Sequence, residues 1–417
     1  MVQRVIFHCD LNSFYASVEL LAHPELVHLP VAVCGDPASR HGIILAKNEH
    51  AKAFDVKTAE TIWSARRKCP DLVLLPASRG KYSHYSKLVN QLYAEFTDLV
   101  EPFGIDESWL DVTGSLHLFG GDAKALADRL RHEVQQRFGL TISVGVSYNK
   151  VFAKLGSDYK KPDATTVILP ADVARIVHPL PVTDLLFVGK STAKLLETYG
   201  VKTIGDLAAF ERDALVALLG KAGDLLHRYA AGLDTAPVAP YGQYTPPKSV
   251  GNGLTFKRNL LGREDVLTAV MMLAEQVAMR LRKHHLKCTT LSVQIKSPEF
   301  RVISRQSPCP MPTYLARELF PQALAIIEAA WDLAYPIRAL TLTAQNLVPE
   351  DEAADQFDLL AARPTARRQK LENLEKTIDN LRSKYGKSVV TFGSAVRDEI
   401  GATSHGESSL PSGENLE

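Results

Sequence analysis

The chain has 417 residues, an apolar fraction of 46% and a formal net charge of +1. That length exceeds what one hydrophobic core usually supports, so we expect two to four domains. No apolar run is long enough to span a membrane, and the five cysteines lack Cys-x-x-Cys spacing; we therefore expect a cytoplasmic protein with reduced thiols, no signal peptide and no membrane contact.

The small net charge hides an uneven distribution. Residues 245–346 carry 13 Lys and Arg against 7 Asp and Glu, whereas residues 347–417 carry 9 against 13. A basic module beside an acidic tail suggests a polyanion partner for the basic module. Many solvated domains carry a similar charge, so an ordinary surface remains the alternative.

The first 170 residues predict one α/β domain with an insertion. Residues 1–23 are predicted to form a strand that leads into an amphipathic helix, and residues 76–170 alternate strands with longer helices. Residues 24–75 differ, because prolines, short strands and short helices replace this pattern. We therefore interpret 24–75 as an insertion between two parts of the same domain.

The rest of the chain predicts smaller parts joined by a linker. Residues 171–236 are predicted to form short helices separated by glycines, and the proline-rich residues 237–247 a linker. Residues 248–346 predict a compact module of strands and two helices. Residues 347–417 predict a flexible tail with one helix, near 364–385. The expected fold class is therefore α+β with several domains.

The helix predicted in the tail has an apolar stripe at helical spacing. Its members are Leu371, Leu374, Ile378, Leu381 and Tyr385. Such a stripe usually marks the buried face of a helix. We expect it to pack on the body of the protein rather than to form a coiled coil.

Carboxylates stand out in two apolar runs. Asp106 and Glu107 are adjacent in a strand-like run, where neighbouring side chains point to opposite faces, and a buried carboxylate is costly without a cation. Asp10 ends another such run, where the pattern turns helical. Side by side, these strands would direct three carboxylates into one gap that suits Mg²⁺ and two-metal phosphoryl transfer. The alternative is an ordinary Asp-Glu pair at a strand edge or turn.

Three stretches together resemble signatures of the Y-family translesion DNA polymerases, nearest to the DNA polymerase IV (DinB-like) branch. They are Asp10–Glu19, Gly104–Val112 and Ser143–Lys150, and their order and spacing match over about residues 1–346. The implied parts are a palm with a mixed or antiparallel sheet (1–23 and 76–170), inserted fingers (24–75), a small helical thumb with a helix–hairpin–helix (171–236), a linker (237–247), a DNA-binding α+β little finger (248–346) and a flexible C-terminal tail (347–417).

The resemblance also implies a metal site. The implied catalytic residues, which hold two Mg²⁺ ions, are Asp10, Asp106 and Glu107, with the backbone carbonyl of Leu11 as a further ligand. Asn12 stands where relatives usually have a second Asp, and Gly104 stands where they have Ser. Because neither is an implied ligand, these departures bear on fine positioning more than on the metal assignment.

Aromatic and basic residues are implied to contact the incoming dNTP. Phe14 and Tyr15 match an aromatic pair in which the second ring is a steric gate against the 2′-hydroxyl of a ribonucleotide. Two aromatics at the start of a helix are also typical of a core, so that alternative stays open. Lys161 matches a lysine that contacts the triphosphate.

A second phosphate-binding pair departs from the family pattern. Glu49 and Lys52 occupy the positions where relatives carry a Tyr-x-x-Arg pair. Lys52 can neutralise phosphate as a point charge, although without the bidentate fork of Arg. An exposed helix with mixed charges explains both residues equally well.

Further stretches are implied to bind DNA and a partner protein. Residues 181–189 lead into a helix and resemble a helix–hairpin–helix, which grips DNA phosphate through backbone N–H groups. A short peptide in the tail resembles the sliding-clamp-binding peptide of bacterial polymerases, and such a tether raises the effective concentration at the primer end. Its residues are Gln356, Phe357, Asp358, Leu359 and Leu360.

The resemblance therefore implies a template-directed DNA polymerase for low-fidelity translesion synthesis, by two-metal-ion transfer of a nucleotide from dNTP to a primer 3′-hydroxyl. Its expected partners are primer–template DNA, dNTP and a sliding clamp; we expect a monomer, in a bacterial cytoplasm and associated with the nucleoid. One alternative is a non-catalytic, clamp-bound relative that acts as a scaffold in a mutagenesis complex. The other is a different palm-type nucleotidyl transferase.

Overall fold

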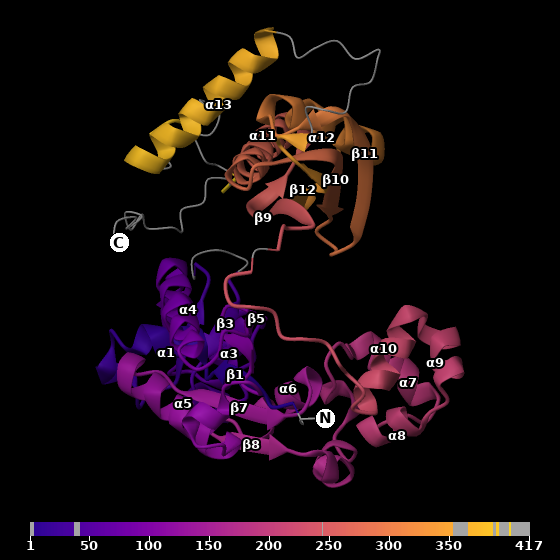
Figure 1. Cartoon of the computed structure of the whole chain (residues 1–417). Coiled ribbons are helices and arrows are strands. Elements are labelled where there is room, and N and C mark those ends of the chain that lie inside the picture. Colours follow the sequence, from indigo (N-terminus) through magenta and orange to yellow (C-terminus); the bar gives the residue numbers. More distant parts are fainter. Residues whose placement is uncertain are drawn as a thin grey trace. The chain divides into compact units, whose positions relative to one another are not determined.

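The computed structural model describes residues 4–36, 42–243, 245–352, 366–386, 389–391 and 400–401. The chain divides into two compact units, whose main boundary lies between residues 244 and 245. Each unit has its own hydrophobic core. Figure 1 labels helices and strands of both units. None of the described helices is long and apolar enough to cross a membrane.

The first unit is built on a five-stranded mixed sheet in the order β5-β6-β1-β7-β8. Its strands are β1 (Ile6–Leu11), β5 (Val100–Pro102), β6 (Glu107–Asp111), β7 (Ile142–Ser147) and β8 (Thr165–Ile168). β1 pairs antiparallel with β6 and with β7, whereas β7 and β8 are parallel. All residues of the central β1 are buried. The expectation of a mixed sheet is confirmed.

Helices cover both faces of this sheet. On one face, α1 (Phe14–Leu20), α4 (Arg79–Ala94) and α5 (Ala123–Phe138) share an apolar core with alternate residues of β1. On the other face lies α6 (Lys150–Tyr159), against β7 and β1. This close approach requires Gly145 of β7, because a Cβ there would lie 1.9 Å from the backbone oxygen of Ala153. The packing therefore fixes which face of α6 meets the sheet.

Two further groups of elements complete the first unit. A small sheet of β2 (Val31–Cys34), β3 (Ile44–Lys47) and β4 (Val73–Pro76) packs with α2 (Glu49–Ala53) and α3 (Ile62–Lys68). The helices α7 (Lys190–Thr198), α8 (Ile204–Ala209), α9 (Arg212–Leu219) and α10 (Lys221–Ala230) share another core. Single turns of helix lie at Pro24–Leu26, Leu116–Phe119, Pro170–Asp172, Val173–Val177 and Val182–Asp184.

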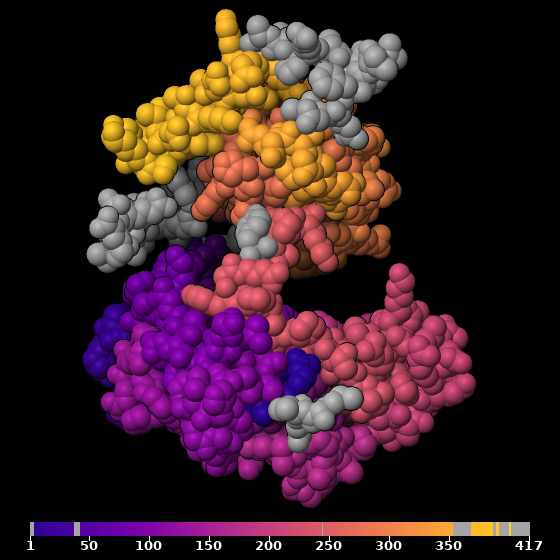
Figure 2. Space-filling model, viewed as in Figure 1, coloured from indigo at the N-terminus to yellow at the C-terminus, as the bar shows by residue number. Residues whose placement is uncertain are grey.

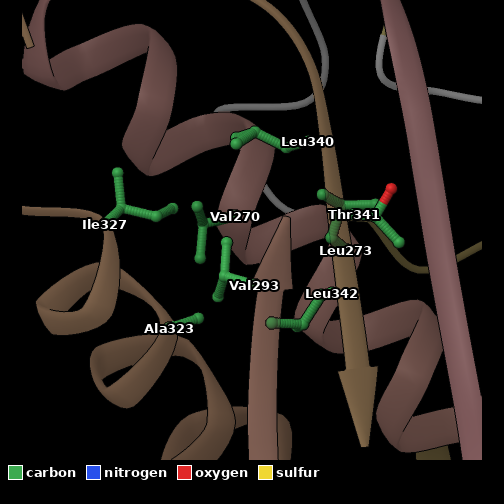
Figure 3. Close-up of a pocket in the computed structure, with 8 residues that line it drawn as sticks. All are labelled: Val270, Leu273, Val293, Ala323, Ile327, Leu340, Thr341 and Leu342. Atoms are coloured by element: carbon green, nitrogen blue, oxygen red, sulfur yellow. The ribbon is translucent and has the colours of Figure 1, made fainter. Parts of the chain in front are cut away.

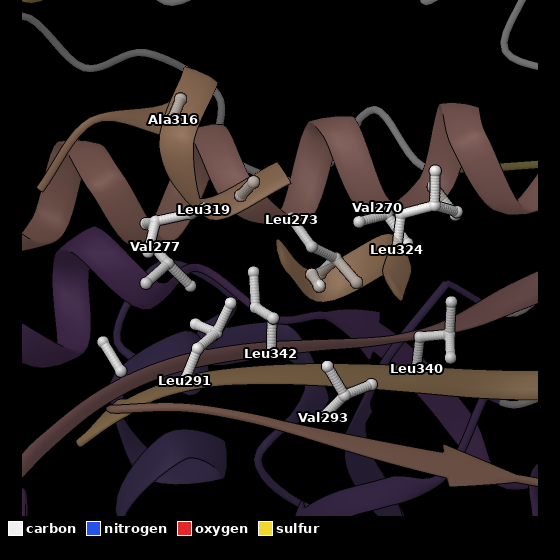
Figure 4. Packing of buried hydrophobic residues seen from close by; sticks show 14 of the residues in the cluster. Val270, Leu273, Val277, Leu291, Val293, Ala316, Leu319, Leu324, Leu340 and Leu342 are labelled. Atoms are coloured by element: carbon white, nitrogen blue, oxygen red, sulfur yellow. The ribbon is translucent and has the colours of Figure 1, made fainter. Parts of the chain in front are cut away.

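The second unit is a four-stranded antiparallel sheet with two long helices on one face. Its strands are β9 (Ser249–Leu260), β10 (Leu286–Lys296), β11 (Val302–Thr313) and β12 (Ile337–Pro349), in the order β11-β10-β12-β9. The helices are α11 (Gly262–Lys283) and α12 (Ala316–Ala330). Alternate strand residues such as Leu291, Val293 and Leu342 face these helices and form the core (Figure 4). The core encloses an apolar cavity of about 10 Å³ (Figure 3), which is too small for a nucleotide.

Helix α13 (Ala366–Tyr385) packs on the second unit, as expected (Figure 2), but it does not do so through the whole of its apolar stripe. Of the expected apolar stripe, Leu371 packs against the core. Leu374, Leu381 and Tyr385 are instead 44%, 39% and 60% exposed. The docked face is largely charged, and its ion pairs join Arg282 to Glu375 and Asp379, Arg382 to Glu275, and Arg368 to Glu318.

Candidate active site

The pairing of β1 with β6 brings two of the predicted carboxylates together. Asp10 lies directly opposite Glu107 in the antiparallel register. Directly opposed residues of such a pair project from the same face of the sheet. Both side chains therefore lie at one corner of the sheet, where β1 ends and β6 begins. The backbone N–H of Leu11 donates to the carbonyl oxygen of Asp106 at 3.0 Å, which draws the third carboxyl residue to the same end of β1.

Asp106 itself lies just outside the strand that we expected to contain it. β6 begins at Glu107, and Asp106 belongs to a bend in which the N–H groups of Phe103 and Gly104 both donate to the carbonyl oxygen of Glu107, at 2.9 and 3.3 Å. Strand alternation therefore does not force the two adjacent carboxylates to opposite faces. A Cβ at Gly104 would lie 3.5 Å from Asp106 Oδ1, an ordinary contact, so the site has room for the Ser that the family resemblance implies at this position.

The pKa values of two of these carboxylates are shifted far from their ordinary values, in opposite directions. Burial, and then the negative charges of Asp10 and Glu107, raise the pKa of Asp106 to about 6. Burial also acts to raise the pKa of Glu107, but the close contacts of His8 and of the Lys154 ammonium outweigh it and bring that pKa down to about 2. Like charges held this close favour a cation between them.

Two lysines supply positive charge at this corner. Lys154 of α6 places Nζ 2.6 Å from Glu107 Oε2 and 3.3 Å from Asp10 Oδ2. Lys161 places Nζ 2.7 Å from the same oxygen of Asp10. Although burial opposes it, neighbouring carboxylates raise the pKa of both lysines, so both are charged at neutral pH. Our sequence analysis singled out Lys161 and missed Lys154.

His8 is a second residue that the sequence analysis missed. It is fully buried, with Nδ1 2.8 Å from Ser157 Oγ and Nε2 3.1 Å from Glu107 Oε2. Burial lowers the pKa of His8, so the ring is neutral at neutral pH. Its position two residues before Asp10, on the same strand face, was the available signal.

These residues fit a hard divalent cation. His8, Asp10 and Glu107 each offer a ligand atom, and the three atoms lie within 4.8 Å of one another. Carboxylate oxygens are the ligands that Mg²⁺ prefers, and Asp10 and Glu107 supply them from neighbouring strands. The like-charge effect on Asp106 is relieved when a cation binds nearby, which is a further reason why this corner suits a metal.

The aromatic pair at the start of α1 divides between core and surface. Phe14 is buried in the main core of the first unit, as the core alternative predicted. Tyr15 is partly exposed, and its ring stacks on that of Tyr82 with centroids 4.0 Å apart and planes inclined by 8°. Tyr15 therefore has one face supported by protein.

The two departures from the family pattern near β1 have local partners. Asn12 is buried; its amide donates to Thr141 Oγ1 at 3.2 Å, and its Oδ1 accepts from Ser143 Oγ at 2.9 Å. It thus ties the end of β1 to β7. Glu49 forms an ion pair with Lys52 and accepts a hydrogen bond from Ser13 Oγ at 3.3 Å. Lys52 is therefore neutralised within α2.

The regions expected to bind DNA lie in the helical part of the first unit and in the second unit. Gly189 is the N-cap of α7. The N–H of Val182 donates to the carbonyl oxygen of Lys202, so the stretch 181–189 lies beside the turn that precedes α8. In the second unit, the exposed ring of Phe300 lies under the cations of Lys296 and Arg338. The clamp-like peptide 356–360 and the polar end 402–417 lie outside the described residues.

Comparison with known proteins gives consistent relatives over nearly the whole chain. Residues 9–158 match the impB/mucB/samB family, and residues 247–359 match the C-terminal domain of that family. DNA polymerase IV of Acetivibrio thermocellus is 46% identical over 95% of this chain and 98% of that protein. DNA polymerase IV 1 of Bacillus subtilis is 35% identical over 96% of this chain and 95% of that protein. A solved Y-family DNA polymerase chimera shares the fold, with a TM-score of 0.74 at 22% identity over 83% of this chain and 99% of that chain.

Proposed function

The chain belongs to the impB/mucB/samB family and is a DNA-directed DNA polymerase of the Y-family translesion class, and on this premise we propose that Asp10, Asp106 and Glu107 are its catalytic carboxylates. The observation that carries the proposal is the register of β1 and β6, which sets Asp10 opposite Glu107. At the same end of β1, the backbone N–H of Leu11 donates a hydrogen bond to the carbonyl oxygen of Asp106. Nucleotide transfer then takes place at this corner of the sheet.

We propose that the corner holds two Mg²⁺ ions. Asp10, Asp106 and Glu107 would be their side-chain ligands, with the backbone carbonyl of Leu11 as a further ligand. When bound, such ions supply activation of the primer 3′-hydroxyl and neutralisation of the departing pyrophosphate. His8 Nε2 lies 3.1 Å from Glu107 Oε2, and this buried contact limits where one of these ligands can move.

The residues around the corner have roles in holding the dNTP. Lys161 neutralises the triphosphate as a point charge. Lys52 of α2 serves as a second cation once it exchanges its partner Glu49 for a phosphate oxygen. Tyr15 presents its ring to the sugar and excludes a 2′-hydroxyl by steric conflict, while Phe14 anchors the start of α1 in the core. The stacking of Tyr15 on Tyr82 supports this role, because a gate must not yield when the sugar presses on it.

The wider arrangement follows the same family plan. We propose residues 1–23 and 76–170 as the palm, 24–75 as the fingers, 171–236 as the thumb, 237–247 as the linker and 248–346 as the little finger. The thumb and little finger would hold primer–template DNA through sequence-independent phosphate contacts. In the tail (347–417), the peptide 356–360 would bind a sliding clamp; this part of the proposal rests on its sequence. We further propose a monomer that acts at the nucleoid of a bacterial cytoplasm.

The alternatives find no support among the relatives. The curated relatives described above are named DNA polymerase IV, and neither is named as a scaffold or as another kind of nucleotidyl transferase. The direct test is primer extension by the purified protein with Mg²⁺, on undamaged and abasic templates. Extension on both templates is expected; a protein that binds primer–template yet extends neither would favour the scaffold.

A further inference from the structure

Asp158 lies next to the candidate active site without belonging to the carboxylate set. It is on α6, four residues after Lys154, so both side chains lie on one face of the helix. Its two oxygens each contact a different lysine: Oδ2 lies 3.4 Å from Lys154 Nζ and Oδ1 lies 2.7 Å from Lys161 Nζ. The side chain is half exposed, so it can accept both cations without a large desolvation penalty.

The same two lysines also cover the oxygens proposed to bind metal. Lys154 lies against Glu107 Oε2 and Asp10 Oδ2, and Lys161 lies against Asp10 Oδ2 as well. An ammonium and a divalent cation repel each other and compete for the same lone pairs. Binding of a metal at these oxygens therefore requires both lysines to withdraw from them.

The geometry points to Asp158 as the positioning residue that receives Lys154 and Lys161 when divalent cations enter the site, an inference that rests on the function proposed above. Asp158 already contacts both lysines, so each can give up one carboxylate and keep another. Because α6 packs tightly on Gly145 of β7, Asp158 stays at a constant distance from Asp10 and Glu107. Asp158 thus sets how readily the site exchanges lysine for metal.

This arrangement predicts opposite effects for two neighbouring substitutions. Lys154→Met removes a competitor and leaves the carboxylates more negative, so metal affinity rises. Asp158→Asn removes the alternative partner, so both lysines stay on Asp10 and Glu107 and metal affinity falls. Purely structural roles for these residues would weaken metal binding in both variants, because both would disturb the same helix.

The experiment is a Mn²⁺ titration of the full-length protein without DNA, with free Mn²⁺ followed by electron paramagnetic resonance. We expect the Kd to fall about tenfold in Lys154→Met and to rise about tenfold in Asp158→Asn, a size typical of residues that support metal ligands. Lys124→Met and Asp128→Asn change another lysine–aspartate pair with the same spacing, on α5, and should leave the Kd unchanged. If Lys154→Met fails to fold by circular dichroism, Lys154→Gln serves as the uncharged variant.

Separate outcomes test the inference and the function on which it rests. Wild-type binding that is abolished in Asp10→Asn supports the metal site; no binding by the wild type, or equal binding by Asp10→Asn, contradicts the proposed function. If the wild type binds and Asp10→Asn does not, but the two α6 variants are unchanged or both weakened, the inference about Asp158 alone is overturned.

Discussion

Tyr15 lies flat against Tyr82, with ring centroids 4.0 Å apart and planes inclined by 8°. Tyr82 is fully buried and cannot move aside, because its hydroxyl donates to Glu19 Oε1 at 2.6 Å and accepts from the N–H of Ser78 at 2.9 Å. The outer ring of the stack is therefore held by a rigid inner one.

Replacing the ring of Tyr15 should weaken the preference for deoxyribonucleotides over ribonucleotides. We expect Tyr15→Ala to raise the efficiency of ribonucleotide relative to deoxyribonucleotide incorporation at least about tenfold, because a contact that rejects the 2′-hydroxyl is lost. Single-nucleotide insertion kinetics measure this ratio. Tyr82→Phe keeps the stack and should leave the ratio unchanged. An unaltered ratio in Tyr15→Ala would mean that Tyr15 is a packing residue.

The position where α6 packs closely on the sheet, Gly145 of β7, should tolerate no side chain. In Gly145→Ala, the new Cβ would meet the backbone oxygen of Ala153 at 1.9 Å, so α6 must shift. Overpacking of this kind lowers the free energy of unfolding by about 1–3 kcal/mol. Gly114→Ala is the matched control, since no atom outside its chain neighbours lies within 4 Å of a Cβ there. Urea unfolding followed by circular dichroism compares them; equal stabilities would contradict the close packing.

The docking of α13 should depend on Arg282. This guanidinium is buried against Glu375 and Asp379, so Arg282→Met leaves Glu375 buried without its cation. Removing one partner of a buried pair typically costs about 3–5 kcal/mol. We expect faster amide hydrogen exchange throughout 366–386. The exposed pair of Arg263 and Glu328 provides the control, because Arg263→Met should have little effect. Unchanged protection of α13 in Arg282→Met would show that other contacts hold it.

Without divalent metal, the carboxylate cluster should make stability depend on pH. The pKa of Asp106 is raised from 3.8 to about 6, so between these values the folded state binds more protons than the unfolded state. The contribution of Asp106 to stability is therefore fully present below pH 4 and is lost as the pH rises through 6. Urea unfolding of wild type and Asp106→Asn at several pH values isolates this contribution. The stability difference should favour the variant increasingly from pH 4 to pH 7; a constant difference would contradict the raised pKa.

Sequence patterns anticipated some of these features and could not show others. Asp10 ends one apolar run and Glu107 lies within another, and that local signal indicated a shared site. The bend that takes Asp106 out of β6 depends on hydrogen bonds to the carbonyl of Glu107, which leave no mark on residue spacing. Lys154 looked like any helix lysine, because its partners on β1 and β6 are 144 and 47 positions away in the numbering.

Helix α13 shows why its apolar stripe misled the sequence analysis. The stripe has regular helical spacing, yet the helix docks through Glu375 and Asp379, whose partner Arg282 lies more than ninety residues earlier in the chain. Periodicity describes one helix in isolation, whereas the docked face is chosen by the groups that α11 and α12 present. No spacing rule contains that information.

The most direct test of the central claim compares catalysis with DNA binding in Asp106→Asn and Glu107→Gln. Both substitutions keep the size of the side chain and remove one negative charge, and Asp128→Asn on α5 provides the same charge change elsewhere. Primer extension with Mg²⁺ and the Kd for primer–template would be measured on the same preparations. The account predicts that both variants lose extension and keep the wild-type Kd, while Asp128→Asn keeps both. Normal extension by either variant would contradict it.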